Sequence, residues 1–161
     1  MPEGFPKPKA RVQYLDAVRI AGDIGEKYGV TIVLEPLLAR ADNLFNYVSE
    51  GMAFVDALEH PRVKLLTDLY HFEAGSEPYG NIVAAGARFG HVHLATPAIP
   101  ETGEGKVYDF TGFLGALKQA GYDGRVSVED NPGLLGKTGE NYAAAIAAVR
   151  AYVESQMPVT V

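Results

Sequence analysis

The sequence predicts an α/β fold in which about four parallel strands alternate with helices. Two observations carry this prediction. Short β-branched runs alternate with longer segments of helical apolar spacing, and glycine and proline residues fall at several of the boundaries between them. Strands joined through helices pair in parallel, because the helix returns the chain to the starting edge of the sheet. No linker divides the chain, so we expect a single domain over residues 1–161.

The first two strand–helix units are predicted from apolar spacing. Apolar residues recur at three- and four-residue steps over 12–28, as on a helix with one buried face, and Gly29 is a typical stop signal after such a helix. The β-branched run 30–35 then predicts a buried strand. A second amphipathic helix is expected over 43–60, followed by a strand over 63–68.

The later units repeat the alternation. We expect a helix over 81–89, a strand over 91–94, a helix over 110–120, a strand over 125–129 and a closing helix over 140–154. A loop rich in proline and glycine separates the third strand from the following helix. The first and last strands would be open edges of such a sheet, and buried parallel edges favour pairing with further strands.

Composition narrows the class of partner. The formal net charge of −6 offers no basic stripe for a phosphate backbone, so a nucleic-acid partner is excluded and a small molecule is expected. No apolar run approaches the roughly 20 residues that span a bilayer, so no membrane partner is expected and the cytoplasm is the default location. The chain has no cysteine, so any metal must be bound by oxygen and imidazole ligands.

Each predicted strand ends in a side chain that can bind a metal: Glu35, Asp68, His93 and Glu129. They lie about one strand–helix unit apart, which places all four at the carboxyl-terminal rim of the sheet, where parallel α/β folds bind their ligands. Three carboxylates and one imidazole suit Mn²⁺, Mg²⁺ or Co²⁺, and Zn²⁺ is also compatible. Without a cation the carboxylates would repel one another, so the sequence predicts one divalent metal site.

Other roles are open to these residues taken singly. A carboxylate after a strand can cap the next helix, and for Asp68 or Glu129 alone capping and metal binding stay equally open. Their joint recurrence at one rim favours the metal. Among the other histidines, His91 is expected one layer deeper in the sheet, in a structural role. His71 lies on a loop where it can reach substrate oxygens, and His60 is expected at the surface of the opposite rim.

Several motifs resemble, in order and spacing, the second half of the sugar phosphate isomerase/epimerase family, which has the xylose isomerase-like TIM barrel fold. That family includes the tagatose/psicose 3-epimerases and is similar to hydroxypyruvate isomerase. The resemblance covers nearly the whole chain and implies half of a (β/α)₈ barrel. The motifs are Leu34-Glu35-Pro36, Leu65-Leu66-Thr67-Asp68-Leu69-Tyr70-His71, Gly90-His91-Val92-His93-Leu94-Ala95, Gly121-Tyr122-Asp123-Gly124 and Val126-Ser127-Val128-Glu129.

The resemblance implies a function as well as a fold. In the family the four matching positions bind one divalent metal, and the two matching glutamates, Glu35 and Glu129, act as the acid/base pair. His71 and, more approximately, Arg40 match substrate-binding residues. The metal polarises the substrate carbonyl and stabilises an ene-diolate while one glutamate removes a proton and the other returns it. The implied function is therefore a metal-dependent isomerase or epimerase acting on a sugar or a hydroxy-keto acid.

The sequence also departs from the family pattern. Ile99 stands where the epimerases carry an arginine shortly after the metal histidine, so that charged substrate contact is not carried over. The first four strands of the barrel have no counterpart in the chain. This implies either that two copies pair in a homodimer or that the chain is a fragment of a longer product whose N-terminal half-barrel is missing here.

Two alternatives to the isomerase remain open. One is a catalytically inactive metal-binding fragment or assembly module of the same fold, and it is favoured by the missing half and by Ile99. The other is phosphodiester hydrolysis, as in abasic-site endonucleases of this fold. It ranks last, because such enzymes need more histidine ligands and a basic DNA groove.

Overall fold

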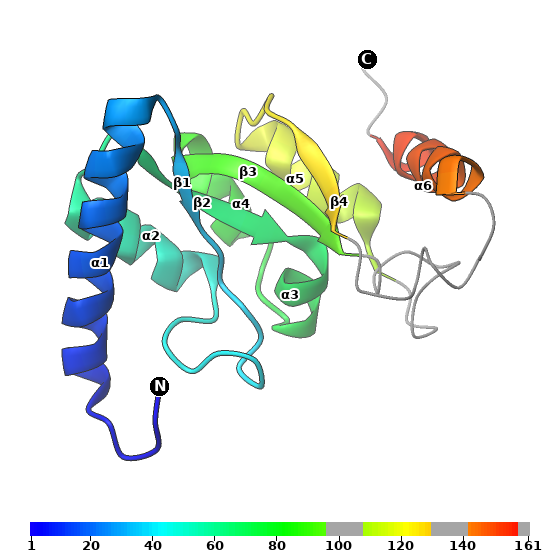
Figure 1. Ribbon diagram of the computed structural model, residues 1–161. Helices are drawn as coiled ribbons and strands as arrows, with labels where there is room; N and C mark the ends of the chain where they lie inside the picture. Colours follow the sequence, from blue (N-terminus) through cyan, green and yellow to red (C-terminus); the bar gives the residue numbers. More distant parts are fainter. Residues whose placement is uncertain (96–107, 130–141, 158–161) are drawn as a thin grey trace.

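The computed structural model describes residues 1–95, 108–129 and 142–157. These residues form one sheet whose strand order follows the sequence, β1-β2-β3-β4, and every neighbouring pair is parallel. The α/β fold predicted from the sequence is thereby confirmed (Figure 1). The elements in chain order are α1 (Lys7–Tyr28), β1 (Ile32–Leu34), α2 (Val48–Leu58), β2 (Val63–Asp68), α3 (Leu69–Ala74), α4 (Gly80–Ala85), the 3₁₀-helix η1 (Gly86–Arg88), β3 (Phe89–Ala95), α5 (Phe110–Gln119), β4 (Val126–Glu129) and α6 (Tyr142–Gln156).

Helix α1 ends where the sequence predicts. Gly29 adopts the left-handed conformation with φ of 71°, and its backbone N–H donates to carbonyl oxygens in the last turn of the helix. Glycine takes this conformation without the steric cost that a Cβ would impose. The turn delivers the chain directly to β1, so Glu35 follows one residue after the strand.

Helix α2 begins later than the predicted residue 43. The Glu77 carboxylate, which is distant in sequence, accepts hydrogen bonds from the backbone N–H groups of Val48 (2.8 Å) and Ser49 (3.0 Å). These N–H groups lie in the first turn of a helix and lack partners inside it, so an acceptor supplied there fixes the start. The Asp42 carboxylate meanwhile accepts from the backbone of Leu44 (3.1 Å) and holds the preceding loop in a turn.

A short helix that the sequence analysis did not predict, α3, follows β2 at once. Its N-cap is Asp68, whose Oδ1 accepts from the backbone N–H of Tyr70 (2.7 Å) and His71 (3.3 Å). The helix predicted over 81–89 is also shorter, because α4 gives way to η1 at Gly86. Prediction from apolar periodicity needs a longer segment than six residues, so an element of this length is seen only through its cap.

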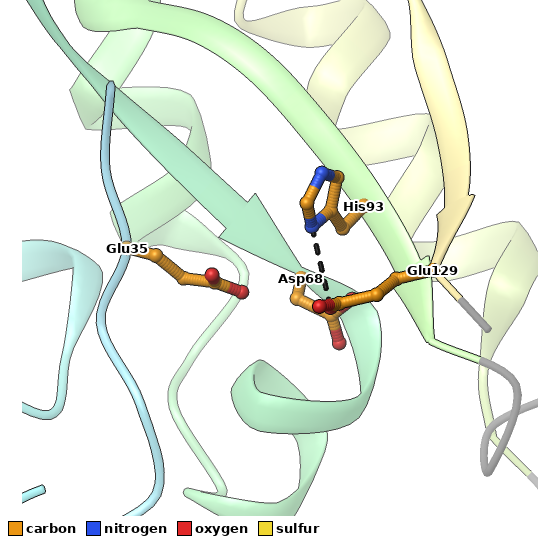
Figure 2. A group of neighbouring side chains, drawn as sticks. All are labelled: Glu35, Asp68, His93 and Glu129. Carbon is orange, nitrogen blue, oxygen red and sulfur yellow. Dashed lines mark ion pairs between the residues drawn. The ribbon is translucent and has the colours of Figure 1, made fainter. Parts of the chain in front are cut away.

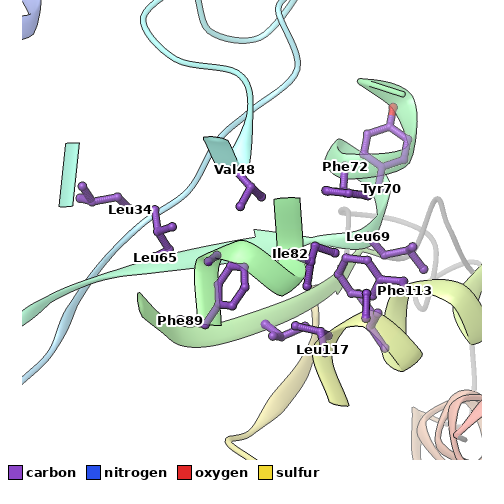
Figure 3. Close-up of a cluster of buried hydrophobic side chains, with 14 of the residues drawn as sticks. Leu34, Val48, Leu65, Leu69, Tyr70, Phe72, Ile82, Phe89, Phe113 and Leu117 are labelled. Atoms are coloured by element: carbon purple, nitrogen blue, oxygen red, sulfur yellow. The ribbon is translucent and has the colours of Figure 1, made fainter. Parts of the chain in front are cut away.

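The hydrophobic core lies between the sheet and the helices that cover one of its faces. Figure 3 shows side chains from β1, β2 and β3 meeting those of α2, α4 and α5. Fully burying a side chain of this size stabilises the fold by about 1.5–3 kcal/mol. The members with almost no exposed surface include Val48, Leu58, Leu65, Ile82, Val92, Leu94, Phe110 and Phe113.

The two edges of the sheet remain open in the described part of the chain. Val126 and Val128 on β4 are 37% and 38% exposed, and Leu94, Val126, Val128, Ile146 and Val149 line an apolar groove between β4 and α6. At the other edge, α1 carries apolar side chains that face solvent, so the expectation that the apolar spacing over 12–28 forms one buried face was wrong for these residues. They are Val12, Ile20, Ile24 and Tyr28. No helix in the described residues is long and apolar enough to cross a membrane.

Candidate metal centre

Four side chains from the four strand ends converge at the carboxyl-terminal rim of the sheet. Each of Glu35, Asp68, His93 and Glu129 offers a ligand atom, and these atoms all lie within 4.8 Å of one another. Figure 2 shows Glu35 reaching in from beside β1 toward Asp68, with His93 and Glu129 coming from β3 and β4. Such a spacing lets one cation contact all four atoms.

The hydrogen bonding of the cluster is incomplete in a way that fits a cation. Glu35 Oε1, Asp68 Oδ2 and His93 Nδ1 are buried and have no hydrogen-bond partner in the described residues. His93 Nδ1 lies 3.4 Å from Glu129 Oε2, close enough for an ion pair but without hydrogen-bond geometry. Buried polar atoms are almost always paired, and three unpaired ones facing a common point fit a divalent ion.

The two carboxylate oxygens of Asp68 have different environments. Oδ1 caps α3 through the backbone of Tyr70 and His71, whereas Oδ2 is the buried atom without a partner. The capping bonds fix the rotation of the carboxylate and so direct Oδ2 toward the other three side chains. Capping and metal binding are therefore compatible functions of this one residue, which is only 1% exposed.

Burial and repulsion between carboxylates raise the pKa of two carboxyl groups of the cluster, Glu35 and Asp68. Burial, with added repulsion from Asp68 and Glu129, raises the pKa of Glu35 from its ordinary 4.5 to about 7. Burial also raises the pKa of Asp68 from 3.8 to about 6, although the backbone N–H groups of His71 and Tyr70 oppose that shift. Protons therefore compete with a cation for these oxygens below about pH 7.

Two residues proposed to contact substrate, His71 and Arg40, lie beside the cluster. His71 is on α3, its Nδ1 is buried without a hydrogen-bond partner in the described residues, and burial lowers the pKa of its imidazole. The nearby Arg40 guanidinium lowers that pKa further. Arg40 lies in the loop after β1 and donates through Nη2 to the hydroxyl of Tyr70. Tyr70 lies between Asp68 and His71 in the sequence but was not among the predicted site residues.

The remaining histidines differ in outcome. The ring of His91 lies 5.2 Å from that of His93, and its Nε2 is 2.9 Å from the Ser127 hydroxyl. His91 and Ser127 each lie two residues before the cluster residue of their own strand, His93 and Glu129. Ser127 was not predicted as a site residue, although its position two residues before Glu129 could have indicated it.

The expectation that His60 is a surface residue was wrong. Its side chain is 7% exposed and its Nε2 lies 3.2 Å from Asp23, because Gly22 of α1 leaves room for the ring. Ile99 lies outside the described residues.

Comparison with known proteins places this geometry in a family. Residues 1–152 match the family described as the Xylose isomerase-like TIM barrel. The chain is 33% identical to an L-ribulose 3-epimerase of Methylomonas sp. (strain DH-1) over 130 residues, which are 78% of this chain and 45% of that protein. It is 26% identical to a 2-oxo-tetronate isomerase of Pectobacterium atrosepticum over 143 residues, 86% of this chain and 53% of that protein.

A solved structure agrees in fold. The crystal structure of IolI protein with a bound zinc atom superposes with a TM-score of 0.78 at 22% identity, covering 99% of this chain and 62% of that one. The chain thus spans about half the length of the relatives that it matches, as expected of a half-barrel. The described strands, their parallel order and the match over residues 1–152 lead to one conclusion: the chain belongs to the xylose isomerase-like TIM barrel family.

Proposed function

We propose that this chain is the metal-binding half of a divalent-metal-dependent isomerase or epimerase that moves a proton on a sugar or a hydroxy-keto acid. The observation that carries the proposal is the convergence of Glu35, Asp68, His93 and Glu129, with three buried ligand atoms lacking partners in the described residues. The isomerase and epimerase relatives support the reaction class, and the zinc atom in IolI protein supports a metal.

The four clustered residues would hold the ion. Oxygen ligands with a single imidazole suit Mn²⁺, Mg²⁺ or Co²⁺, and Zn²⁺ also accepts this set. When bound, the ion would polarise the substrate carbonyl and offset the negative charge that builds up on its oxygen. His71 on α3 and Arg40 on the loop after β1 lie beside the cluster and would bind the substrate oxygens.

Glu35 and Glu129 are suited to proton transfer because they enter the centre from opposite edges of the sheet. One carboxylate takes the proton from the carbon next to the carbonyl, and the C–H electron pair moves to form an ene-diolate. The other carboxylic acid returns a proton, so the count of protons balances. Return to the opposite face of the same carbon gives an epimer. Return to the neighbouring carbon, with transfer of the hydroxyl proton from one ene-diolate oxygen to the other, gives the aldose or ketose isomer.

Wild-type chain loaded with Mn²⁺ tests the proposal. We expect one Mn²⁺ per chain by metal analysis after dialysis. In D₂O we expect metal-dependent deuterium incorporation into D-fructose or hydroxypyruvate by NMR, above a blank of Mn²⁺ alone. Failure to retain Mn²⁺ would remove the basis of the proposed function.

A catalytically inactive metal-binding unit is the second candidate. It is favoured by the open edges and by Glu129, whose side chain is 51% exposed, because a barrel open on this side admits water to the proton-transfer step. One Mn²⁺ per chain without deuterium exchange on either compound would decide for this candidate.

We also propose that residues 1–161 form one half-barrel domain whose open edges are covered in the working assembly, either by a second copy or by the missing N-terminal half-barrel. If copies pair, light scattering should give about twice the 17.3 kDa chain mass. Val128→Asp on β4 should then return the mass to the monomer, because it places a charge in the exposed apolar edge.

The matched control for this edge is Val83→Asp, since Val83 is equally exposed at 37% but lies on α4. The control variant should keep the wild-type mass. A wild-type monomer at all concentrations would contradict pairing between copies and leave the missing N-terminal half-barrel as the closing element.

A further inference from the structure

The Arg40–Tyr70 pair lies beside the candidate metal centre. Arg40 is an exposed residue of the loop after β1, its Nη2 donates to the Tyr70 hydroxyl, and its guanidinium carbon lies 5.9 Å from the centre of the Tyr70 ring. Within the described ranges, Arg40 forms no ion pair with a carboxylate. A guanidinium has five N–H donors, so this contact leaves most of them open to a ligand.

Tyr70 is itself firmly placed. It is 8% exposed, its ring packs against Tyr108 with 6.0 Å between centroids, and its backbone N–H donates to Asp68 Oδ1 at 2.7 Å. A rigid chain of contacts thus leads from the metal-binding carboxylate through Tyr70 to the guanidinium. Arg40 is held at a defined place relative to the centre even though its own backbone is in a loop.

The charge around the metal centre decides which substrates need a positively charged side chain such as Arg40. Glu35, Asp68 and Glu129 carry three negative charges when ionised, so with one divalent ion the cluster keeps a net charge of about −1. A neutral sugar has no net charge and is not repelled by the cluster. A substrate with a carboxylate is repelled by it unless a positive group faces the carboxylate. Arg40 is the positive group at hand, because it donates to the hydroxyl of Tyr70, whose backbone N–H donates to Asp68 Oδ1.

We infer that Arg40, positioned by Tyr70, binds the carboxylate of the substrate, so that the chain prefers hydroxy-keto acids over uncharged ketoses. The guanidinium fork matches a carboxylate in geometry and forms charge-assisted hydrogen bonds with it. The relative that acts on 2-oxo-tetronate, a carboxylic acid, shows that such compounds occur among the substrates of similar proteins. The inference depends on the proposed function, since the substrate carbonyl is to be held at the metal.

Hydroxypyruvate and dihydroxyacetone provide the test, because they share one skeleton and differ only in a carboxylate against a hydroxymethyl group. We expect calorimetry on the full chain loaded with Mn²⁺ to show at least tenfold tighter binding of hydroxypyruvate. Arg40→Gln should reduce that preference to within about twofold, because one charge-assisted contact accounts for roughly a 10- to 100-fold difference in affinity. Tyr70→Phe should lose an intermediate part of it, since the guanidinium remains but is no longer held.

The matched control is Arg19→Gln, which makes the same change of charge at an exposed residue of α1 and should keep the wild-type preference. Mn²⁺ affinity is measured for each variant, so that a lost metal site is distinguished from a lost carboxylate site. If Arg40→Gln keeps both the Mn²⁺ affinity and the full preference for hydroxypyruvate, the carboxylate binds the metal and the inference is wrong. Equal affinity of the wild-type protein for the two compounds would overturn it as well.

Discussion

Asp68→Asn is expected to weaken Mn²⁺ binding about a hundredfold or more while leaving the metal-free fold intact. The amide oxygen of asparagine can still accept the backbone hydrogen bonds that cap α3, so the local structure is kept. The amide nitrogen takes the place of Oδ2, the buried oxygen without a partner, and an uncharged NH₂ group cannot bind a cation. Isothermal titration with Mn²⁺ measures the loss.

The same variant should change how stability depends on pH. In the metal-free wild type, the folded-state pKa values of Asp68 and Glu35, about 6 and about 7, are above their ordinary values. The folded state therefore holds protons that the unfolded chain has released, and this contribution to stability is present below about pH 4 and is lost as pH rises to about 7. Thermal unfolding should show a lower midpoint at pH 8 than at pH 5, a smaller difference in Asp68→Asn, and recovery of the wild type with Mn²⁺.

Asp109→Asn is the matched control for Asp68→Asn. Asp109 caps α5 by accepting from the backbone N–H of Gly112 at 2.8 Å, but it lies outside the metal cluster. The control variant should bind Mn²⁺ as the wild type does. Undiminished Mn²⁺ affinity in Asp68→Asn would show that Asp68 is only a helix cap, and the four-residue site would then be abandoned.

Most of the fold could be predicted from the sequence, because the patterns that mark its strands and helix ends are local. The β-branched runs and the glycine that ends α1 act within a few residues, and they predict where the strands and helices lie along the chain without tertiary information. The start of α2 was misplaced for the opposite reason. Its first turn is fixed by the carboxylate of Glu77, which lies far along the chain and carries no local mark of that contact.

The candidate site could be predicted from the sequence for a geometric reason. In a parallel sheet every strand ends at the same rim, so a metal-binding side chain at each strand end predicts convergence, and the structure brings the four ligand atoms within 4.8 Å. The contact between Arg40 and Tyr70 joins the loop after β1 to helix α3, and neither residue is marked by spacing or composition. Such a contact depends on how that loop folds over the rim, which the sequence does not indicate.

Replacing either Glu35 or Glu129 by glutamine is expected to lower net epimerisation or isomerisation by about a thousandfold, the usual scale for loss of a positioned acid or base. Glutamine keeps a ligand oxygen but cannot carry the proton, so Mn²⁺ should still bind, with reduced affinity. If the two residues serve opposite faces of the substrate, the variants should differ in a specific way. Each should still exchange the proton of one epimer with D₂O, because the remaining carboxylate removes and returns it on its own face, while inversion stops.

Nuclear magnetic resonance of the two epimers of one ketose in D₂O separates these events, since exchange without inversion labels a carbon but leaves its configuration unchanged. Glu154→Gln is the control, because Glu154 is an exposed carboxylate paired with Arg150 on α6, and it should retain full turnover. A single variant that stops exchange of both epimers would show that one residue is the sole base. Retained inversion in both variants would mean that the proton travels by another route, and since Glu35 and Glu129 are the two carboxylates that enter the cluster from opposite edges of the sheet, the two-face mechanism would then have no structural basis.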